Sequence, residues 1–364
     1  MKILEVVPQL AAGGGERFVV DLSNELAKSN DVVLYTFHND NIGGNGFYRD
    51  EIVHNVKYIN EHLDGSSKFK MMVSFLRLVK KENPDVIHYH MCYIWGILVY
   101  FFYGWRKKIY MTVHGNVAKS YSTLIHKIVM NTFARIGWLH VITISDDNHR
   151  IFKKYYPSVN AALIYNGRAP LSISKSIAEV RHEIELYKNS MTTTVFIHVA
   201  RFHPIKNQKM LVVAFNSFVQ QGNDAILLIV GKFDTCPEVD EIKNIAGPSI
   251  HFLGLKKNVP DYLSCSDVFC LSSLHEAMPI SVIEAVNMGL AIVSTPVSGS
   301  MDVVKEGVTG YISSGHTPEE FCQALSKLYL EKESILKNAK MEASNSQFTM
   351  ERCAKYYIDE FAAR

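Results

Sequence analysis

Residues 268–285 read VFCLSSLHEAMPISVIEA, which combines an apolar strand, a polar loop and the start of a helix. The continuous run from Val268 to Leu271 is typical of a strand buried on both faces of a parallel sheet. Pro279 suits the first turn of the helix, and Gly289 suits the position just past its end. This segment therefore predicts one strand–loop–helix unit of a parallel α/β sheet.

The same unit carries two carboxylates beside a place where anions bind. Glu276 precedes the helix and Glu284 lies inside it, while the amides of Met278 to Ser281 form a helix start that attracts anions. Carboxylates would repel an anion, but they accept hydrogen bonds from hydroxyl groups on the same ligand. A sugar joined to a nucleoside diphosphate has hydroxyls at both ends and phosphates between them.

The alternation of strands and helices extends along the whole chain. The predicted strands are 3–7, 32–37, 86–89, 109–113, 140–144, 162–165, 194–199, 225–230, 250–253, 268–271 and 291–294. A polar stretch interrupts the pattern near the middle, so we predict an α/β protein with two Rossmann-like parallel-sheet domains. Their expected bounds are 1–168 and 190–348, joined by a linker at 169–189.

Two more loops that follow strands favour phosphate binding. Gly13-Gly14-Gly15-Glu16 follows the first strand, although its spacing is neither GxGxxG nor a Walker loop. Arg201 and Lys206 follow the strand at 194–199, and two fixed cations can hold a diphosphate without a metal. Taken singly, a tight turn or an ordinary solvated loop explains each of these features as well.

Composition limits the class of protein. The 364 residues are 48% hydrophobic and 20% charged, so they can bury a large core, and the net charge of +2 argues against a nucleic-acid partner. The six cysteines form no CxxC pair and fit a reducing compartment. No Asp-x-Asp triplet occurs in the chain, so we expect neither a metal nor another cofactor.

One apolar run is long enough to cross a bilayer. Val86 to Trp105 contains no Asp, Glu, Lys or Arg over 20 residues. His88, His90 and two glycines weaken that interpretation, and we favour a buried strand at 85–89 followed by a helix at 92–103.

Together these motifs resemble the retaining glycosyltransferases of family GT4, which have the GT-B fold. The resemblance covers about residues 1–320. It rests on Glu276-x7-Glu284, Arg201 with Lys206, Gly14-Gly15 near Glu16, Thr112-Val113-His114-Gly115, Asn166-Gly167 and the loop from Pro296 to Val304. The chain departs from the family pattern where Glu16 follows Gly15 directly, where Ala277 replaces a frequent glycine, and where Arg168 follows Asn-Gly.

The resemblance implies a fold and a role for each matched residue. The implied GT-B fold has two Rossmann-like domains facing a central cleft, with the last helix, at about 349–364, packed on the first domain. Arg201 and Lys206 would bind the donor diphosphate and stabilise the leaving nucleotide. Glu276 would contact the transferred sugar, and His114 would lie near it. The other donor-binding residues that the resemblance implies are Gly14, Gly15, Gly254, Val259, Met278, Pro279, Ile280, Ser281 and Glu284.

The reaction that the resemblance implies is transfer of a sugar from a nucleoside-diphosphate sugar, with UDP favoured, to a hydroxyl of a glycan. The configuration would be retained, with the departing phosphate as the base. Such enzymes act in bacterial surface-polysaccharide biosynthesis, which includes O-antigen, capsule and exopolysaccharide. The alternatives are another GT-B enzyme, such as an epimerase or a phosphorylase, and a non-catalytic partner that binds sugar nucleotides.

The first domain indicates where an acceptor would be met. Residues 1–165 hold 19 Lys and Arg against 14 Asp and Glu, and aromatic and basic residues are interleaved within 101–160. Such surfaces contact anionic lipid, although a solvated face over an aromatic core has a similar composition. We therefore expect a lipid-linked glycan acceptor and a cytoplasmic enzyme that is peripheral on the inner face of the cytoplasmic membrane.

Overall fold

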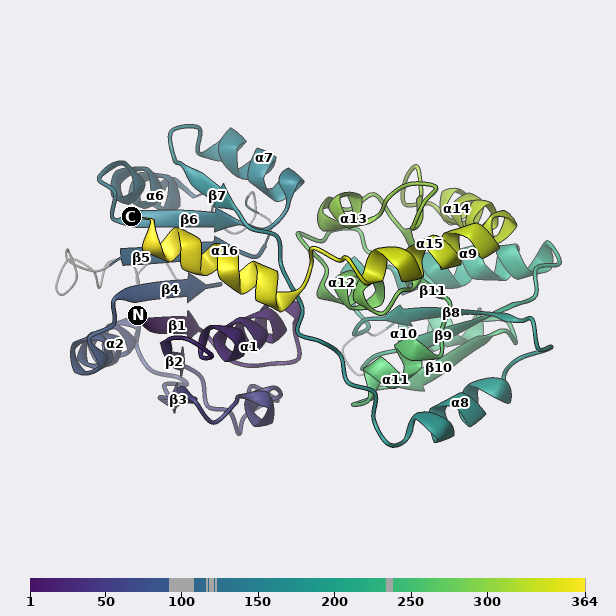
Figure 1. Ribbon diagram of the computed structural model, residues 1–364, viewed down its shortest axis with the longest axis horizontal. Coiled ribbons are helices and arrows are strands. Elements are labelled where there is room, and N and C mark those ends of the chain that lie inside the picture. Colours follow the sequence, from purple (N-terminus) through teal and green to yellow (C-terminus); the bar gives the residue numbers. More distant parts are fainter. Residues whose placement is uncertain (92–107, 116, 118–120, 122, 234–237, 364) are drawn as a thin grey trace. The chain divides into compact units, whose positions relative to one another are not determined.

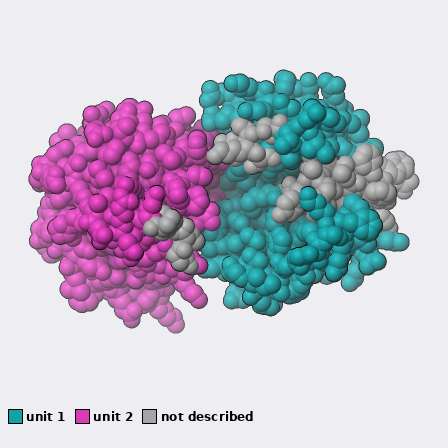
Figure 2. All heavy atoms as spheres, turned by 180° about the vertical axis from the view of Figure 1, so that it is seen from behind, with its two compact units in different colours: residues 1–169, 348–364 teal, residues 170–347 magenta. Residues whose placement is uncertain are grey.

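The computed structural model describes residues 1–363 except 92–107, 116, 118–120, 122 and 234–237. The chain divides into two compact units. One consists of Met1–Ala169 together with Phe348–Arg364, and the other of Pro170–Gln347. Figure 2 colours these two units separately.

The first unit is a parallel sheet of seven strands in the order β3-β2-β1-β4-β5-β6-β7 (Figure 1). The strands are β1 Lys2–Val7, β2 Asp31–Thr36, β3 Val56–Asn60, β4 Val86–His90, β5 Lys108–Val113, β6 Leu139–Thr143 and β7 Ala161–Leu163. The described helices are α1 Gly14–Leu26, α2 Lys68–Glu82, α6 Leu124–Arg135, α7 Asp146–Tyr155 and α16 Met350–Ala362, with a short 3-10 turn at Arg49–Glu51.

The central strands of this sheet are buried on both faces. Every residue of β4 is buried, and so is every residue of β1 after Lys2. This pattern explains why the strands are continuous apolar runs rather than alternating ones. Glu5, His88 and His90 are the polar exceptions within these two strands, and they are completely buried.

The helix α16 follows the second unit in the sequence, but it packs in the first unit. Thr349 caps its start by accepting a hydrogen bond from the amide of Arg352. The Tyr110 hydroxyl donates to the Glu360 carbonyl oxygen at 2.9 Å, which fixes the far end of the helix on β5. Tyr357 and Phe361 are completely buried there, so α16 supplies part of the core.

The second unit is a parallel sheet of six strands in the order β10-β9-β8-β11-β12-β13. Its strands are β8 Thr194–Val199, β9 Ala225–Val230, β10 Ile250–Gly254, β11 Val268–Leu271, β12 Ala291–Ser294 and β13 Gly310–Ile312. Its described helices are α8 Ile177–Glu185, α9 Gln208–Gln220, α10 Val239–Asn244, α11 Val259–Ser264, α12 Ile280–Asn287, α13 Ser298–Val303, α14 Pro318–Leu330 and α15 Lys332–Ala343, and a 3-10 turn spans Pro204–Lys206.

The stretch expected to be a linker, 169–189, is largely structured. It contains α8, and it is tied to α11 by Asp261, a buried carboxylate that accepts a hydrogen bond from the Ser174 amide at 2.7 Å. The Tyr262 hydroxyl also donates to Glu183 at 2.7 Å. These contacts place most of this stretch within the second unit.

Each strand predicted from the sequence is present, and two more were missed. The missed strands are β3, at one edge of the first sheet, and β13, at one edge of the second. Within the long apolar run, β4 confirms the strand expected at 85–89, whereas the helix expected at 92–103 lies outside the described residues. None of the described helices has the length and apolar character that crossing a membrane requires.

Candidate functional site

The predicted donor-binding residues of the second unit follow the carboxyl ends of neighbouring strands. Arg201 and Lys206 follow β8, Gly254 ends β10, and Glu276 follows β11. Since β10, β9, β8 and β11 are adjacent in one parallel sheet, these residues gather at the same edge. That edge is where open α/β sheets bind ligands.

Lys206 and Glu276 are in direct contact. The resemblance implied that Lys206 binds the donor diphosphate and that Glu276 contacts the transferred sugar. The Lys206 ammonium donates to Oε1 of Glu276, and both side chains are largely buried. The Ser273 hydroxyl donates to the same oxygen at 2.8 Å. As far as the described residues go, two further ammonium hydrogens of Lys206 and the second oxygen of Glu276 remain for a ligand.

Two loops are fastened together around this ion pair. The Ser272 hydroxyl donates to the Lys206 carbonyl oxygen at 2.7 Å, and the Leu274 amide donates to the Ile205 carbonyl oxygen at 2.8 Å. The loop after β8 is thus held against the loop after β11. Arg201 is different, because its side chain is exposed and has no ion-pair partner within the part of the chain that the structure describes.

The helix start at α12 lies one residue later than the sequence indicated. Pro279 is the N-cap residue, and the helix begins at Ile280. Met278, Pro279 and Ile280 are buried, whereas Ser281 and Glu284 are partly exposed. Gly289 follows the helix with a φ of +79°, the left-handed conformation that the prediction required of it.

Gly299 packs so closely on the backbone before α12 that no side chain fits at its position. A Cβ atom on Gly299 would lie 2.6 Å from Cα of Met278. The Gly299 amide instead donates to the Ala277 carbonyl oxygen at 2.9 Å. This contact fixes the loop that carries Glu276, even though Ala277 stands where a glycine is frequent.

The loop between Gly254 and Val259, two of the donor-binding residues that the resemblance implied, is held to the same edge. Gly254 has a φ of +72°, and its carbonyl oxygen accepts from the Gly231 amide at 2.9 Å. Val259 is the first residue of α11 and is partly exposed.

In the first unit, the glycine loop begins α1 directly. Gly13 is the N-cap, so Gly14 and Gly15 lie in the first turn of the helix. A Cβ atom on Gly15 would lie 2.9 Å from the sulfur of Met91. Glycine is favoured here because the backbone at this position comes so close to the end of β4.

His114 follows β5 and belongs to a network that sequence reasoning missed. Its Nε2 lies 2.8 Å from Nδ1 of His90, and His90 Nε2 lies 2.6 Å from a carboxylate oxygen of Glu5. His88 Nδ1 lies 2.9 Å from the same oxygen of Glu5. The signal in the sequence was a Glu in an otherwise apolar strand beside a His-x-His pair, whose members share one face of a strand.

The network shifts the pKa of three of its members. Burial opposes ionisation of Glu5, but the imidazoles of His88 and His90 outweigh it and lower the pKa of the carboxyl to about 2. Burial, followed by the charge of His88, lowers the pKa of His90 to about 4. Burial also lowers the pKa of His114 well below its ordinary value.

Glu5, His88 and His90 are also residue types that ligate metal ions, and their ligand atoms lie within 4.8 Å of one another. Each of these atoms is already engaged in a hydrogen bond of the network. Hydrogen bonding therefore accounts for the burial of these three side chains.

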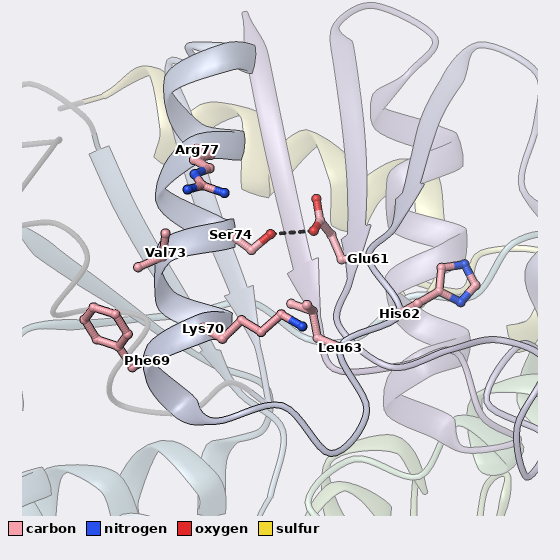
Figure 3. Close-up of a pocket in the computed structure, with 8 residues that line it drawn as sticks. All are labelled: Glu61, His62, Leu63, Phe69, Lys70, Val73, Ser74 and Arg77. Carbon is pink, nitrogen blue, oxygen red and sulfur yellow. Dashed lines mark hydrogen bonds between the residues drawn. The ribbon is translucent and has the colours of Figure 1, made fainter.

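A separate pocket of about 490 Å³ lies between the end of β3 and the helix α2 (Figure 3). It is lined by Glu61, His62, Leu63, Phe69, Lys70, Val73, Ser74 and Arg77. The Ser74 hydroxyl donates to Glu61, as the dashed line in Figure 3 marks. None of the predicted donor-binding residues lines this pocket.

Two family models match the chain. One, described as glycosyl transferases group 1, matches residues 193–331, and the other, described as Glycosyltransferase Family 4, matches residues 12–169. The chain belongs to glycosyltransferase family 4. This membership confirms the resemblance that the paired glutamates and the cation pair indicated.

Several curated relatives of this family 4 protein are glycosyltransferases by name. It is 25% identical over 293 residues to the N-acetyl-alpha-D-glucosaminyl L-malate synthase of Bacillus anthracis, and the matched region covers 77% of this chain and 75% of that protein. It is 25% identical to the UDP-Gal:alpha-D-GlcNAc-diphosphoundecaprenol alpha-1,3-galactosyltransferase of Escherichia coli, over 70% and 69% of the two chains. It is 24% identical to the capsular polysaccharide biosynthesis glycosyltransferase CapH of Staphylococcus aureus, over 92% of each. The protein is thus a glycosyltransferase with homologues in bacterial capsule and polysaccharide biosynthesis.

Solved structures confirm the fold class. The HepE protein of Anabaena in complex with UDP and glucose superposes with a TM-score of 0.80 at 18% identity, over the whole of both chains. A glycosyltransferase from Rickettsia africae superposes with a TM-score of 0.80 at 17% identity, over 100% of this chain and 98% of that one. The predicted GT-B class, with two Rossmann-like parallel-sheet units, is therefore correct.

Proposed function

We propose that this glycosyltransferase moves a sugar from a UDP-sugar to a hydroxyl of a glycan acceptor, with retention of configuration and without a metal. The observation that carries the proposal is the contact of Lys206 with Glu276 at the carboxyl edge of the second sheet. It joins a cation suited to the diphosphate and a carboxylate suited to sugar hydroxyls in one place. UDP is favoured because it appears in the names of the Escherichia coli relative and of the Anabaena complex.

The chemistry asks for charge stabilisation more than for acid catalysis. The leaving group of a nucleotide sugar is a phosphate of low basicity, so breaking the bond from C1 to oxygen mainly requires groups that stabilise the new negative charge. Lys206, the exposed Arg201 and the amides at the start of α12 are suited to that task. The second oxygen of Glu276 would accept from a sugar hydroxyl, and Glu284, inside α12, from the ribose.

Retention follows in this proposal if the acceptor hydroxyl attacks from the face that the nucleotide leaves. The departing phosphate oxygen then takes the acceptor's proton, so no protein residue needs to act as the base. We assign no covalent nucleophile among the site residues.

The test of donor binding is a thermal-shift series with UDP, GDP, ADP and CDP in EDTA. A ligand at 100 times its Kd stabilises the folded state by about 2.7 kcal/mol, which corresponds to roughly 2–4 °C. We expect a shift with UDP that chelation does not change and that Lys206→Gln abolishes. Lys209→Gln is the matched control, because Lys209 lies three residues away and pairs on the surface with Glu241.

Turnover assays separate the proposal from its alternatives. Transfer from a UDP-sugar only when a glycan is present supports it. Isomerisation of the donor without an acceptor would indicate an epimerase, and UDP binding with no turnover on any acceptor would indicate a non-catalytic partner. A shift that requires a divalent metal would contradict the metal-free site.

We also propose that the acceptor is lipid-linked and that α6 docks on anionic membrane. Leu124, Ile125 and Ile128 on this helix are exposed by 74%, 57% and 58%, and Lys127 lies between them. Arg150 and Lys154 on α7 add exposed positive charge to the same unit. Apolar side chains flanked by cations are what an interfacial contact with acidic lipid uses.

Sedimentation with vesicles tests this contact. We expect binding to vesicles rich in phosphatidylglycerol, and a loss of binding when Leu124, Ile125 and Ile128 are all changed to serine. The control is Leu330→Ser, because Leu330 is an exposed leucine of the second unit. Equal binding of the triple variant and the wild type would contradict docking through α6.

A further inference from the structure

A hydrogen-bonded chain of ionisable side chains runs through the sheet of the first unit. Glu5 lies on β1, His88 and His90 lie on the neighbouring β4, and His114 follows β5. The first three are completely buried. Burying a carboxylate costs free energy unless hydrogen bonds and charges compensate it, so the arrangement of these bonds matters to the protein.

The direction of each hydrogen bond follows from what each group can donate. The carboxylate of Glu5 only accepts, so His90 carries a proton on Nε2, which lies 2.6 Å from it. Because burial and the charge of His88 lower the pKa of His90 to about 4, its ring is neutral at pH 7 and its Nδ1 has no proton. His114 must then donate from Nε2 to that nitrogen, across 2.8 Å.

We propose that Glu5 and His90 are positioning residues that hold His114 neutral with its proton on Nε2, so that its Nδ1 lone pair accepts a hydrogen bond from a hydroxyl of the donor sugar. This inference rests on the proposed function, because it takes His114 to lie near that sugar. In this form His114 recognises a hydroxyl without adding charge. If His114 carried its proton on Nδ1, that nitrogen would donate instead, and the sugar hydroxyl would have to accept the hydrogen bond.

The other arm of the network ends away from His114. His88 Nε2 lies 2.8 Å from the Thr112 hydroxyl oxygen, which lies 3.0 Å from the hydroxyl oxygen of Tyr357 on α16. This arm shares Glu5 and is equally buried, but it has no part in orienting His114. Tyr357→Phe, which removes one hydroxyl at its far end, is therefore a matched control.

The test is nitrogen-15 NMR of the histidine rings in the full-length protein at pH 7, with His114 assigned by the loss of its signals in His114→Asn. In the wild type and in Tyr357→Phe we expect His114 to be protonated on Nε2 alone. In Glu5→Gln the carboxamide can donate to His90 Nε2, which moves the proton of His90 to Nδ1 and that of His114 to Nδ1 as well. We therefore expect the Nδ1-protonated form of His114 to appear in Glu5→Gln.

Three outcomes overturn the proposal. They are a wild-type His114 protonated on Nδ1, an unchanged His114 in Glu5→Gln, and the same change in Glu5→Gln and Tyr357→Phe, which would mean a general loosening of the sheet. The first of these is decided on the wild type alone, so the test does not depend on whether the variant folds.

Kinetics separate this positioning role from the proposed function. We expect Glu5→Gln to lower kcat/KM roughly tenfold with UDP affinity unchanged, because Glu5 is not among the residues predicted to bind UDP and most of those residues lie on the second unit. Tyr357→Phe should keep wild-type values. If the wild type binds no UDP, the proposed function fails although the NMR result stands. If Glu5→Gln transfers sugar as fast as the wild type, the positioning role fails although the proposed function stands.

Discussion

At the scale of single residues, the sequence pointed to side chains whose chemistry suits a ligand, but it did not show which groups hold those side chains in place. Lys206 and Glu276 were named for their chemistry, and the structure brings them into contact. The partners of His114 were missed, because a glutamate inside an apolar strand suggests only an interruption until the neighbouring strand is known. The register that pairs Glu5 with His88 is a tertiary fact that no local pattern contains.

The buried histidine predicts a pH dependence of stability. Unfolding returns His90 from a pKa of about 4 to an ordinary value near 6.5, so the unfolded state binds more protons between these pH values. Stability is fully present above about pH 6.5 and falls as the pH drops towards 4. We expect the first unit to lose roughly 1–2 kcal/mol between pH 7 and pH 5 through this group.

Urea unfolding followed by tryptophan fluorescence measures this loss, because all three tryptophans, at positions 95, 105 and 138, belong to the first unit. His90→Gln should flatten the dependence on pH, and the exposed His54→Gln should leave it unchanged. The same slope in both variants would contradict the assignment to His90.

Arg168 is one of the residues at which the chain departs from its family, and the structure gives it a partner. Its guanidinium donates to the buried carboxylate of Asp21 on α1. Arg168→Leu leaves the Asp21 carboxylate with Arg17, at 3.4 Å, as its one cationic partner among the described residues, so we expect the unfolding free energy of the first unit to fall by about 3 kcal/mol. Arg150→Leu, which breaks an exposed pair with Asp147, should cost less than about 0.5 kcal/mol.

The double variant Asp21→Leu with Arg168→Leu checks the cause. It should recover most of the loss, because no uncompensated charge remains buried. A double variant as unstable as Arg168→Leu would mean that packing, and not charge, explains the effect.

At the scale of helices and strands, continuous apolar runs were sufficient to predict a strand, whereas runs that mix polar and apolar residues were not. β9 reads AILLIV and is buried throughout, so its pattern alone identified it. β3 reads VKYIN and is mostly half-buried at the edge of its sheet, and β13 has only three residues. Edge strands have one neighbour and less burial, so their sequences carry little of the signal that periodicity detects.

The helix α16 offers a sharp contrast between adjacent tyrosines. Tyr357 is completely buried against the first sheet, whereas Tyr356 is 59% exposed. We expect Tyr357→Ala to cost about 3–5 kcal/mol in the fluorescence-detected unfolding, because it leaves a cavity in the core. Tyr356→Ala should stay within about 0.5 kcal/mol, and similar losses in both would mean that α16 is not packed as described.

At the scale of the whole molecule, the sequence predicted two parallel-sheet units because the strand pattern stops and restarts near the middle. It could not show that the stretch at 169–189 contains a helix held by Asp261, because a polar helix on a surface resembles a linker in composition. The donor-binding residues that we propose on the second unit could be named from the sequence because they follow strand ends, where function in this architecture concentrates.

Hydrogen exchange with and without UDP tests how binding is distributed over the molecule. We expect UDP to slow exchange in the segments at 200–207 and 272–284 of the second unit, while the strands β1 and β4 keep their rates. Lys206→Gln should remove the protection. Protection confined to the first unit would contradict the placement of the nucleotide.

The position of α16 along the chain has a consequence for synthesis. The 178 residues of the second unit, Pro170–Gln347, are translated between the first sheet and the helix that completes its core. At roughly 5–20 residues per second, about 10–35 s pass in which the surface of the nascent first sheet that Tyr357 and Phe361 later cover stays open to solvent. During that interval the growing chain is exposed to chaperones and to other nascent chains, and its maturation depends on the ribosome reaching its last helix.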